Sequence, residues 1–289
     1  MPQSRQPSGG LEGLATLVTG GGSGIGLGCA KRFAADGAAV TICGRGEERL
    51  EKAVHEIQEV AAPGASVRWV RADVTVEADV EAAIAKASEP TGSLDGVVAS
   101  AGGSAWLGPM TLTPLEVFEQ VIAMNITSTF LTIKHAVPMM ARAGGGSIVG
   151  ISSIAAHLTH RYFGPYPVGK AGIEALVRNA ADEFGPAGVR VNAIRPGLIG
   201  TEMVSFITQG GPVLDDYLSQ TPIGRVGSVD DVAGLARFLV GPEAVWITGQ
   251  LIGVDGGHSL RRGPDFTAFA EPTYGKAALM GLPSEEDGD

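Results

Sequence analysis

Tyr166 and Lys170 are separated by one helical turn in the segment Tyr166-Pro167-Val168-Gly169-Lys170. On a helix, side chains at this spacing share a face, so the phenol and the ammonium can meet. A free tyrosine has a pKa of about 10, too high for ready proton exchange at neutral pH, and a nearby cation favours the phenolate. The pair indicates a tyrosine that transfers protons, although the same spacing also occurs on ordinary helical surfaces.

Ser153 is a candidate for the same site. The segment at residues 146–153, GSIVGISS, has the composition of a buried strand and ends in Ile151-Ser152-Ser153. A serine at the end of such a strand can point into the crevice beyond it.

Asn125 is the third polar candidate. We predict a helix that opens with a capping box at Thr113-Pro114-Leu115-Glu116. Asn125 follows Phe118, Val121 and Ile122 at helical spacing, which places it on the apolar face. A buried amide needs partners, so Asn125 either belongs to the site or braces the backbone from the core.

A glycine-rich segment, Thr19-Gly20-Gly21-Gly22-Ser23-Gly24-Ile25-Gly26, joins the first predicted strand to the first helix. Glycines let the backbone approach a pyrophosphate, and the helix N-terminus supplies amides and a positive dipole. The candidate dinucleotide-binding residues are Gly20, Ser23, Gly24, Ile25 and Gly26; the alternative is a plain tight turn.

Arg45 follows Gly44 at the end of the second predicted strand. In a dinucleotide-binding fold an acidic residue here binds the ribose 2′-hydroxyl of NAD, whereas an arginine accommodates the 2′-phosphate of NADP. The first carboxylate after the strand is Glu47. Arg45 therefore favours NADP(H), with NAD(H) possible; the alternative is a solvated surface arginine.

Asp73 and Val74 follow the third predicted strand. An aspartate there can accept a hydrogen bond from the adenine amino group. Thr75 and Glu77 resemble a helix start, so helix capping is an equally good interpretation of Asp73.

Alternating strands and helices must position these residues. Strands are predicted at residues 14–20, 38–45, 66–74, 95–102, 146–153, 189–197 and 246–257, with helices between them. This order predicts an α/β fold, a Rossmann-type doubly wound parallel sheet in a single domain. Such sheets bind ligands at the carboxyl ends of their strands, where the candidate residues fall.

We assign residues 13–260 to this dinucleotide-binding domain. Residues 1–12 are rich in Pro, Ser and Gly and are expected to be disordered. Residues 261–289 form a C-terminal extension that ends in the acidic run SEEDGD, also expected to be disordered.

Charge and composition exclude several classes of function. The net charge of −10 provides no basic footprint for nucleic acid. No apolar run reaches the roughly 18–20 residues of a membrane span, and the polar N-terminus lacks a signal-like segment, so a cytoplasmic protein is expected. Cys29 and Cys43 are interpreted as small buried residues, and no Cys/His cluster has the spacing of a metal site.

Together, the segment TGGGSGIG, Asn125, Ser153, YPVGK and Arg195-Pro196-Gly197 resemble the short-chain dehydrogenase/reductase family over residues 13–258. The resemblance implies that Tyr166 donates the proton and Ser153 binds the carbonyl oxygen. It also implies that Lys170 binds the nicotinamide ribose and lowers the Tyr166 pKa, while Asn125 holds a relay water.

The resemblance extends to the cofactor. It implies that Pro196, Gly197, Ile199 and Thr201 hold the carboxamide end and supports Asp73 as the adenine contact. The sequence departs from the family in Ala99-Ser100-Ala101-Gly102, where asparagines are common. Ala101 and Gly102 are still expected to line the cofactor, with the rigidity of this segment in question.

The resulting hypothesis is an NADP(H)-dependent oxidoreductase that interconverts a carbonyl and a secondary alcohol on a hydrophobic small-molecule substrate, such as a ketoacyl thioester, a steroid-like ketone or an aromatic ketone. The alternatives are an NAD-dependent alcohol dehydrogenase on the same scaffold and, remotely, an inactive nucleotide sensor. The resemblance implies a homotetramer or homodimer, built on the helices that begin near Pro114 and Tyr166 and on the last strand.

The substrate site is expected beneath a lid at residues 202–222. Candidates for its apolar wall are Met203, Phe206, Ile207, Leu214, Tyr217, Trp106, Leu107, His157 and Tyr162. Residues 260 to about 280 are expected to be ordered and near a substrate cleft, either that of their own chain or that of a neighbouring subunit, or else merely structural.

Overall fold

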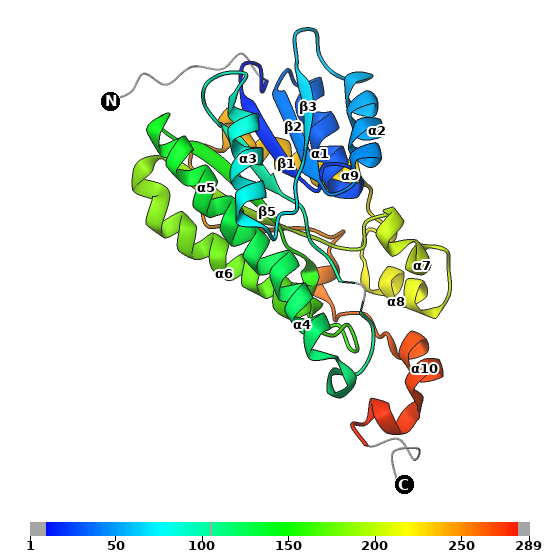
Figure 1. Cartoon of the computed structure of the whole chain (residues 1–289). Helices are drawn as coiled ribbons and strands as arrows, with labels where there is room; N and C mark the ends of the chain where they lie inside the picture. Colours follow the sequence, from blue (N-terminus) through cyan, green and yellow to red (C-terminus); the bar gives the residue numbers. More distant parts are fainter. Residues whose placement is uncertain (1–9, 105, 283–289) are drawn as a thin grey trace.

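In the computed structural model, which describes residues 10–104 and 106–282, seven parallel strands form one sheet. Their order is β3-β2-β1-β4-β5-β6-β7, so the chain winds outward in both directions from β1 and β4 (Figure 1). The strands are β1 Ala15–Thr19, β2 Ala39–Gly44, β3 Val67–Arg71, β4 Gly96–Ala99, β5 Gly146–Ile151, β6 Val189–Pro196 and β7 Leu251–Val254. The single-domain, doubly wound prediction is confirmed.

Helices cover both faces of the sheet because its strands are apolar on both sides. One face carries α1 Gly24–Ala35, α2 Glu47–Gln58 and α9 Val229–Val240. The other carries α3 Glu77–Ser88, α5 Ser128–Arg142 and α6 Tyr166–Phe184 (Figure 1). A separate hydrophobic cluster fills each interface and holds the strand ends in fixed positions.

The helix expected to carry Asn125 is interrupted. α4 spans Leu115–Ile122, a π-helical turn follows at Ala123–Thr127, and α5 then begins. The predicted capping box is wrong, because Pro114 is the N-cap residue and the Thr113 hydroxyl instead lies 3.4 Å from the Pro109 carbonyl oxygen. π-Turns often occur at functional sites.

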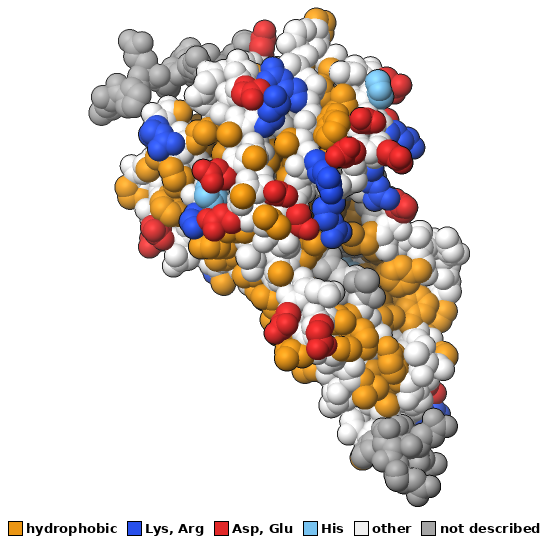
Figure 2. All heavy atoms as spheres, in the orientation of Figure 1, with side chains coloured by type: hydrophobic (Ala, Val, Ile, Leu, Met, Phe, Trp, Pro, Cys, Tyr) orange, Lys and Arg blue, Asp and Glu red, His pale blue; other side chains and the backbone are white. Residues whose placement is uncertain are grey.

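Three short helices lie beyond the sheet's carboxyl edge. α7 Ser205–Thr208 and α8 Pro212–Gln220 belong to the lid, and α10 Thr267–Leu279 belongs to the C-terminal extension. In Figure 1, α10 follows α8 toward the C-terminal end of the molecule. Figure 2 shows hydrophobic side chains over much of this lower part of the visible face.

Two predicted segments need correction. The last strand is confined to β7, since Trp246 is almost fully exposed and Gly249 turns the chain with a φ of +70°. Leu11 is not disordered: it is fully buried, and its N–H donates to the Asp36 carbonyl. Residues 1–9 and the acidic end, 284–289, lie outside the described residues.

The cysteine prediction is confirmed. Cys29 and Cys43 are free and fully buried, and burial raises the pKa of each thiol to about 12, so both are unreactive. Within the described ranges, no helix is long and apolar enough to cross a membrane. The same residues contain no cluster of His, Cys, Asp or Glu suited to a metal ion.

Candidate active site

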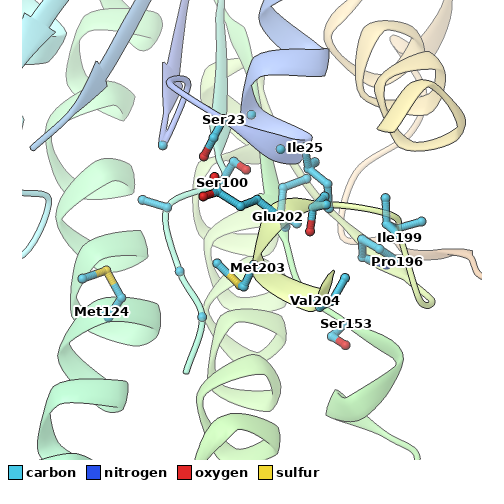
Figure 3. A pocket seen from close by; sticks show the side chains of 18 of the residues that line it. Ser23, Ile25, Ser100, Met124, Ser153, Pro196, Ile199, Glu202, Met203 and Val204 are labelled. Carbon is cyan, nitrogen blue, oxygen red and sulfur yellow. The ribbon is translucent and has the colours of Figure 1, made fainter. Parts of the chain in front are cut away.

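A cleft of about 840 Å³ opens at the carboxyl ends of the strands. Its walls include every residue that the sequence predicts for catalysis or cofactor binding except Asn125. The glycine segment, the ends of β2, β3 and β4, the start of α6 and the segment after β6 all meet there. Figure 3 shows Ser23, Ile25, Ser153, Met203 and Val204 around this cleft.

The glycine segment leaves space that side chains would fill. A Cβ at Gly20 would lie 3.0 Å from the Ala101 backbone, and one at Gly26 would overlap the Gly20 carbonyl oxygen. Ser23 is the N-cap of α1, yet its hydroxyl makes no cap hydrogen bond within the described residues. This open helix N-terminus fits the pyrophosphate of a dinucleotide.

At the end of the cleft expected to bind adenosine, the lining contains two arginines and two carboxylates. Arg45 lines this end, and so does Arg49, which sequence reasoning missed. Arg49 lies in the first turn of α2, whose N-cap is Gly46, and the clue to it is that this helix begins directly after Arg45. Arg49 lies 3.9 Å from Glu202 of the lid, whereas Glu47 pairs with Arg71 and is not part of the cleft lining.

Asp73 also lines this end of the cleft. Its Oδ1 accepts hydrogen bonds from the hydroxyl (2.7 Å) and N–H (3.0 Å) of Thr75. These bonds lower the pKa of Asp73, so it is ionised at neutral pH. The helix that follows has Val76 as its N-cap, so Asp73 shapes a turn and does not cap α3.

Tyr166, Lys170 and Ser153 come together in the middle of the cleft. Tyr166 is the first residue of α6, and Lys170 Nζ lies 5.6 Å from the centre of its ring. Lys170 is buried and donates to the Ile151 carbonyl at 2.8 Å. Ser153 Oγ accepts from the Ala155 N–H at 3.1 Å, and its hydroxyl also hydrogen-bonds with Tyr166.

Burial dominates the electrostatics of this group. It lowers the pKa of Lys170 to about 8 and raises the pKa of Tyr166, while hydrogen bonding with Ser153 opposes the rise. The expected lowering of the Tyr166 pKa by Lys170 is therefore wrong for this structure. Tyr166 is held in its protonated form, which is the form that can donate a proton.

Asn125 is fully buried behind the cleft. Its Oδ1 accepts from the Gly103 N–H at 3.1 Å, and its Nδ2 donates to the Gly103 carbonyl at 2.9 Å. A Cβ at Gly102 would lie 2.7 Å from Asn125 Oδ1 and 3.1 Å from Lys170 Nζ. The side chain thus braces the backbone beside the catalytic candidates, and the π-turn places it there.

The Ala99–Gly102 segment is held without the asparagines common in the family. The buried Thr19 hydroxyl oxygen accepts from the N–H groups of Ser100 and Ala101, each at 3.1 Å. With Asn125 holding Gly103 on the other side, this segment has fixed backbone partners at both ends.

A buried ion pair, missed by sequence reasoning, supports the catalytic helix. Arg195 on β6 donates to both carboxylate oxygens of Glu174 on α6, at 2.5 and 2.6 Å. The Ser152 hydroxyl adds a bond of 2.9 Å to Glu174. These contacts tie α6 to β5 and β6.

The far end of the cleft is mainly apolar. Met203, Ile207 and Tyr217 line it as predicted, together with His160, Phe163 and Val204, which were not predicted. A Cβ at Gly103 would lie 3.2 Å from Met203 Cε, so the lid reaches across to the opposite wall. The other expected wall residues are wrong, since the lining excludes Phe206, Leu214, Trp106, Leu107, His157 and Tyr162.

The C-terminal extension packs behind this apolar end. Phe266 is fully buried and stacks on Phe163, with ring centres 4.9 Å apart, and Phe163 in turn contacts the Tyr166 ring at 4.8 Å. Arg262 pairs with Asp216 of α8. The extension is ordered through residue 282 and lies beside the cleft of its own chain, as expected for residues 260 to 280.

The fold and the cleft together define a class, the dinucleotide-dependent oxidoreductases. A family model described as Enoyl-(Acyl carrier protein) reductase matches residues 20–259. The chain belongs to the short-chain dehydrogenase/reductase family and is an NAD(P)-dependent oxidoreductase acting on carbonyl or alcohol groups.

Individual relatives agree with this assignment. The structure of a short-chain type dehydrogenase/reductase from Mycobacterium ulcerans is 46% identical, with a TM-score of 0.93, covering 95% of this chain and 100% of that one. A 7α-hydroxysteroid dehydrogenase in complex with NADH and 7-oxo glycochenodeoxycholic acid is 34% identical, with a TM-score of 0.80, covering 86% and 94%. The 2,5-dichloro-2,5-cyclohexadiene-1,4-diol dehydrogenase LinX of Sphingobium indicum is 37% identical, covering 86% and 98%.

Proposed function

We propose that this protein is an NADP(H)-dependent reductase of hydrophobic ketones that also oxidises the corresponding secondary alcohols. The observation that carries the proposal is the cleft itself, where Tyr166 and Ser153 lie between an end that contains Arg45 and Arg49 and an end that is mainly apolar. The 7α-hydroxysteroid dehydrogenase and LinX, named for ring-shaped substrates, support a hydrophobic substrate.

The polar side chains in the middle of the cleft account for the proposed chemistry. A bound nicotinamide cofactor supplies or accepts the hydride. The Ser153 hydroxyl, which hydrogen-bonds with Tyr166 in the structure, binds the substrate oxygen as charge builds there, and the protonated Tyr166 donates its proton to the same atom. Lys170 orients the cofactor ribose, and Asn125 keeps the adjacent backbone rigid.

Cofactor preference rests on Arg45 and Arg49. The 2′-phosphate of NADP needs cationic partners, and a guanidinium offers a matching fork of donors. Hydrogen bonds to charged groups contribute about 1.5–3 kcal/mol, or roughly 10- to 150-fold in affinity. The carboxylates in the cleft lining are Asp73 and Glu202, and neither lies at the end of β2.

The test compares kcat/KM for NADPH and NADH in the wild type and in Gly44→Asp combined with Arg45→Ala. A Cβ at Gly44 meets only Leu50, at 3.7 Å, so an aspartate fits there. We expect the double variant to shift toward NADH. Equal use of both cofactors by the wild type would instead favour the alternative, an NAD-dependent alcohol dehydrogenase.

We further propose a cytoplasmic homotetramer or homodimer. Large apolar side chains are exposed on α4, α5 and α6 and next to β7, the elements that the family resemblance implies for assembly. They are Leu115, Phe118, Phe130, Val168, Val245 and Trp246. Exposed apolar patches of this kind support contacts with a second copy.

A further inference from the structure

The apolar end of the cleft contains two polar side chains that the proposed reaction does not use. His160 and Tyr217 both line the cleft and are only 6% and 5% exposed. Their rings are 6.3 Å apart, and both rings contact Phe266 of the C-terminal extension. Buried polar groups are normally paired, so each calls for a partner.

His160 has a hydrogen-bond acceptor, Nε2, without a protein donor among the described residues. Its Nδ1 lies 3.0 Å from the Leu158 carbonyl oxygen, and because a carbonyl can only accept, Nδ1 carries the hydrogen. Burial lowers the pKa of His160 to about 4, so the ring is neutral at pH 7. The proton on Nδ1 then leaves Nε2 as a lone-pair acceptor, and Nε2 bonds to none of the described residues.

Tyr217 offers a hydroxyl. Burial, and then the neighbouring Tyr166 phenol, raise the pKa of Tyr217, so its hydroxyl stays neutral. The ring is held edge-on against His258, with centres 5.5 Å apart, but the hydroxyl hydrogen-bonds to no described residue. Among the fully buried side-chain nitrogen and oxygen atoms in the described ranges, only Thr41 Oγ1 and Trp106 Nε1 have no hydrogen-bond partner. The Tyr217 hydroxyl and His160 Nε2 therefore remain open to a ligand.

The surroundings define the ligand's chemistry. Around the two polar groups the wall is apolar, with Phe163, Met203 and Ile207. The cations of the lining lie elsewhere: Arg45 and Arg49 belong to the nucleotide end, and Lys170 donates to the Ile151 carbonyl in the middle of the cleft. A neutral oxygen is therefore favoured over a carboxylate, which would be buried without a cation.

We propose that His160 and Tyr217 form a second recognition site for a hydroxyl group carried by the substrate in addition to its reacting carbonyl. One hydroxyl satisfies both groups, since it donates to Nε2 and accepts from the Tyr217 hydroxyl. A second keto oxygen can only accept a hydrogen bond from the Tyr217 hydroxyl, and a hydrocarbon can form a hydrogen bond with neither side chain. The substrate class, which rests on the proposed function, is a neutral, mainly apolar hydroxyketone.

The test uses a panel of decalone-sized ketones, each with and without one ring hydroxyl at different positions. We expect the wild type to prefer at least one hydroxyketone over its parent ketone by about tenfold or more in kcat/KM, in line with two hydrogen bonds of roughly 0.5–1.5 kcal/mol each. Tyr217→Phe removes only the hydroxyl. His160→Asn retains a donor for the Leu158 carbonyl and removes the Nε2 acceptor.

Each variant should reduce this preference at least threefold. The matched control is Tyr274→Phe, whose hydroxyl binds the Leu107 carbonyl outside the cleft lining; it should keep the wild-type preference. Titration with NADPH checks that every variant is folded.

The outcomes separate the two proposals. If the wild type turns over no ketone of the panel with either cofactor, the proposed function fails. If ketones are turned over without a hydroxyl preference, only the recognition site is overturned. A preference that persists unchanged in folded Tyr217→Phe and His160→Asn overturns it as well.

Discussion

At the scale of single residues, we expect turnover to depend on the hydroxyl group of Tyr166. Tyr166→Phe removes it while keeping the ring that packs against Phe163. General acid catalysis contributes about 10²–10⁴-fold, so kcat should fall by that amount. The affinity for NADPH, measured by fluorescence titration, should change little. Near-normal turnover would show that another group supplies the proton.

Glu174 makes a stability prediction at the same scale. Glu174→Ala leaves Arg195 without its carboxylate partner in a largely buried position, and breaking such a pair costs about 3–5 kcal/mol. The free energy of unfolding in urea, at fixed protein concentration, measures the loss.

The matched control for that experiment is Glu56→Ala. It breaks the more exposed pair of Glu56 and Lys31 and should cost no more than about 1 kcal/mol. Equal losses in the two variants would mean that the ion pair does not anchor α6.

Residue-level prediction succeeded where several weak signals pointed to one place. Tyr166, Ser153 and the glycines were found because each follows a strand or opens a helix. His160 and Phe163 were missed because they lie in a loop without periodicity. Only the fold brings them beside Tyr217 and Phe266, which are distant in the sequence.

At the scale of elements, the C-terminal extension makes its own prediction. It lies outside the matched residues 20–259, yet Phe266 supports Phe163 beside Tyr166. Because small misplacements at a reacting centre cost up to about 10²-fold, Phe266→Ala should lower kcat/KM for hydrophobic ketones roughly 10- to 100-fold. Deletion of residues 262–289 should do at least as much.

Deletion of residues 283–289 alone serves as the control and should leave the kinetics unchanged. Unaltered KM values for every ketone after deletion of residues 262–289 would show that the extension has no role in substrate binding.

Element prediction was most accurate for the buried strands, whose apolar runs leave few alternatives. Element prediction failed where the local sequence favoured one structure and the path of the chain in the fold required another. Trp246 and Ile247 have strand-forming side chains but precede the turn at Gly249. Thr113 has the sequence of a cap, but Pro114 takes that position because the chain enters α4 one residue later.

At the scale of the whole molecule, assembly should depend on the exposed apolar side chains. Trp246 is 97% exposed in the single chain, so Trp246→Glu should break one set of contacts and halve the mass of a tetramer. Adding Phe118→Glu should break the second set and yield monomers. Light scattering at micromolar concentration measures each mass, with Val60→Glu, on a different surface, as the control. A monomeric wild type would refute the expected assembly.

The π-turn at Ala123–Thr127 has a consequence for how this chain tolerates insertions and deletions. An extra residue in a helical turn shifts the phase of everything after it, by about 100° for each residue in an α-helix. Removing one residue between α4 and α5 would leave a continuous helix of nearly the same length. The face of α4 that now continues toward Asn125 would then point elsewhere, and either α5 would turn away from the sheet or Asn125 would leave Gly103. A single-codon deletion here should therefore be far more damaging than one in an exposed loop such as Gly210-Gly211, where the backbone has no helical phase to keep.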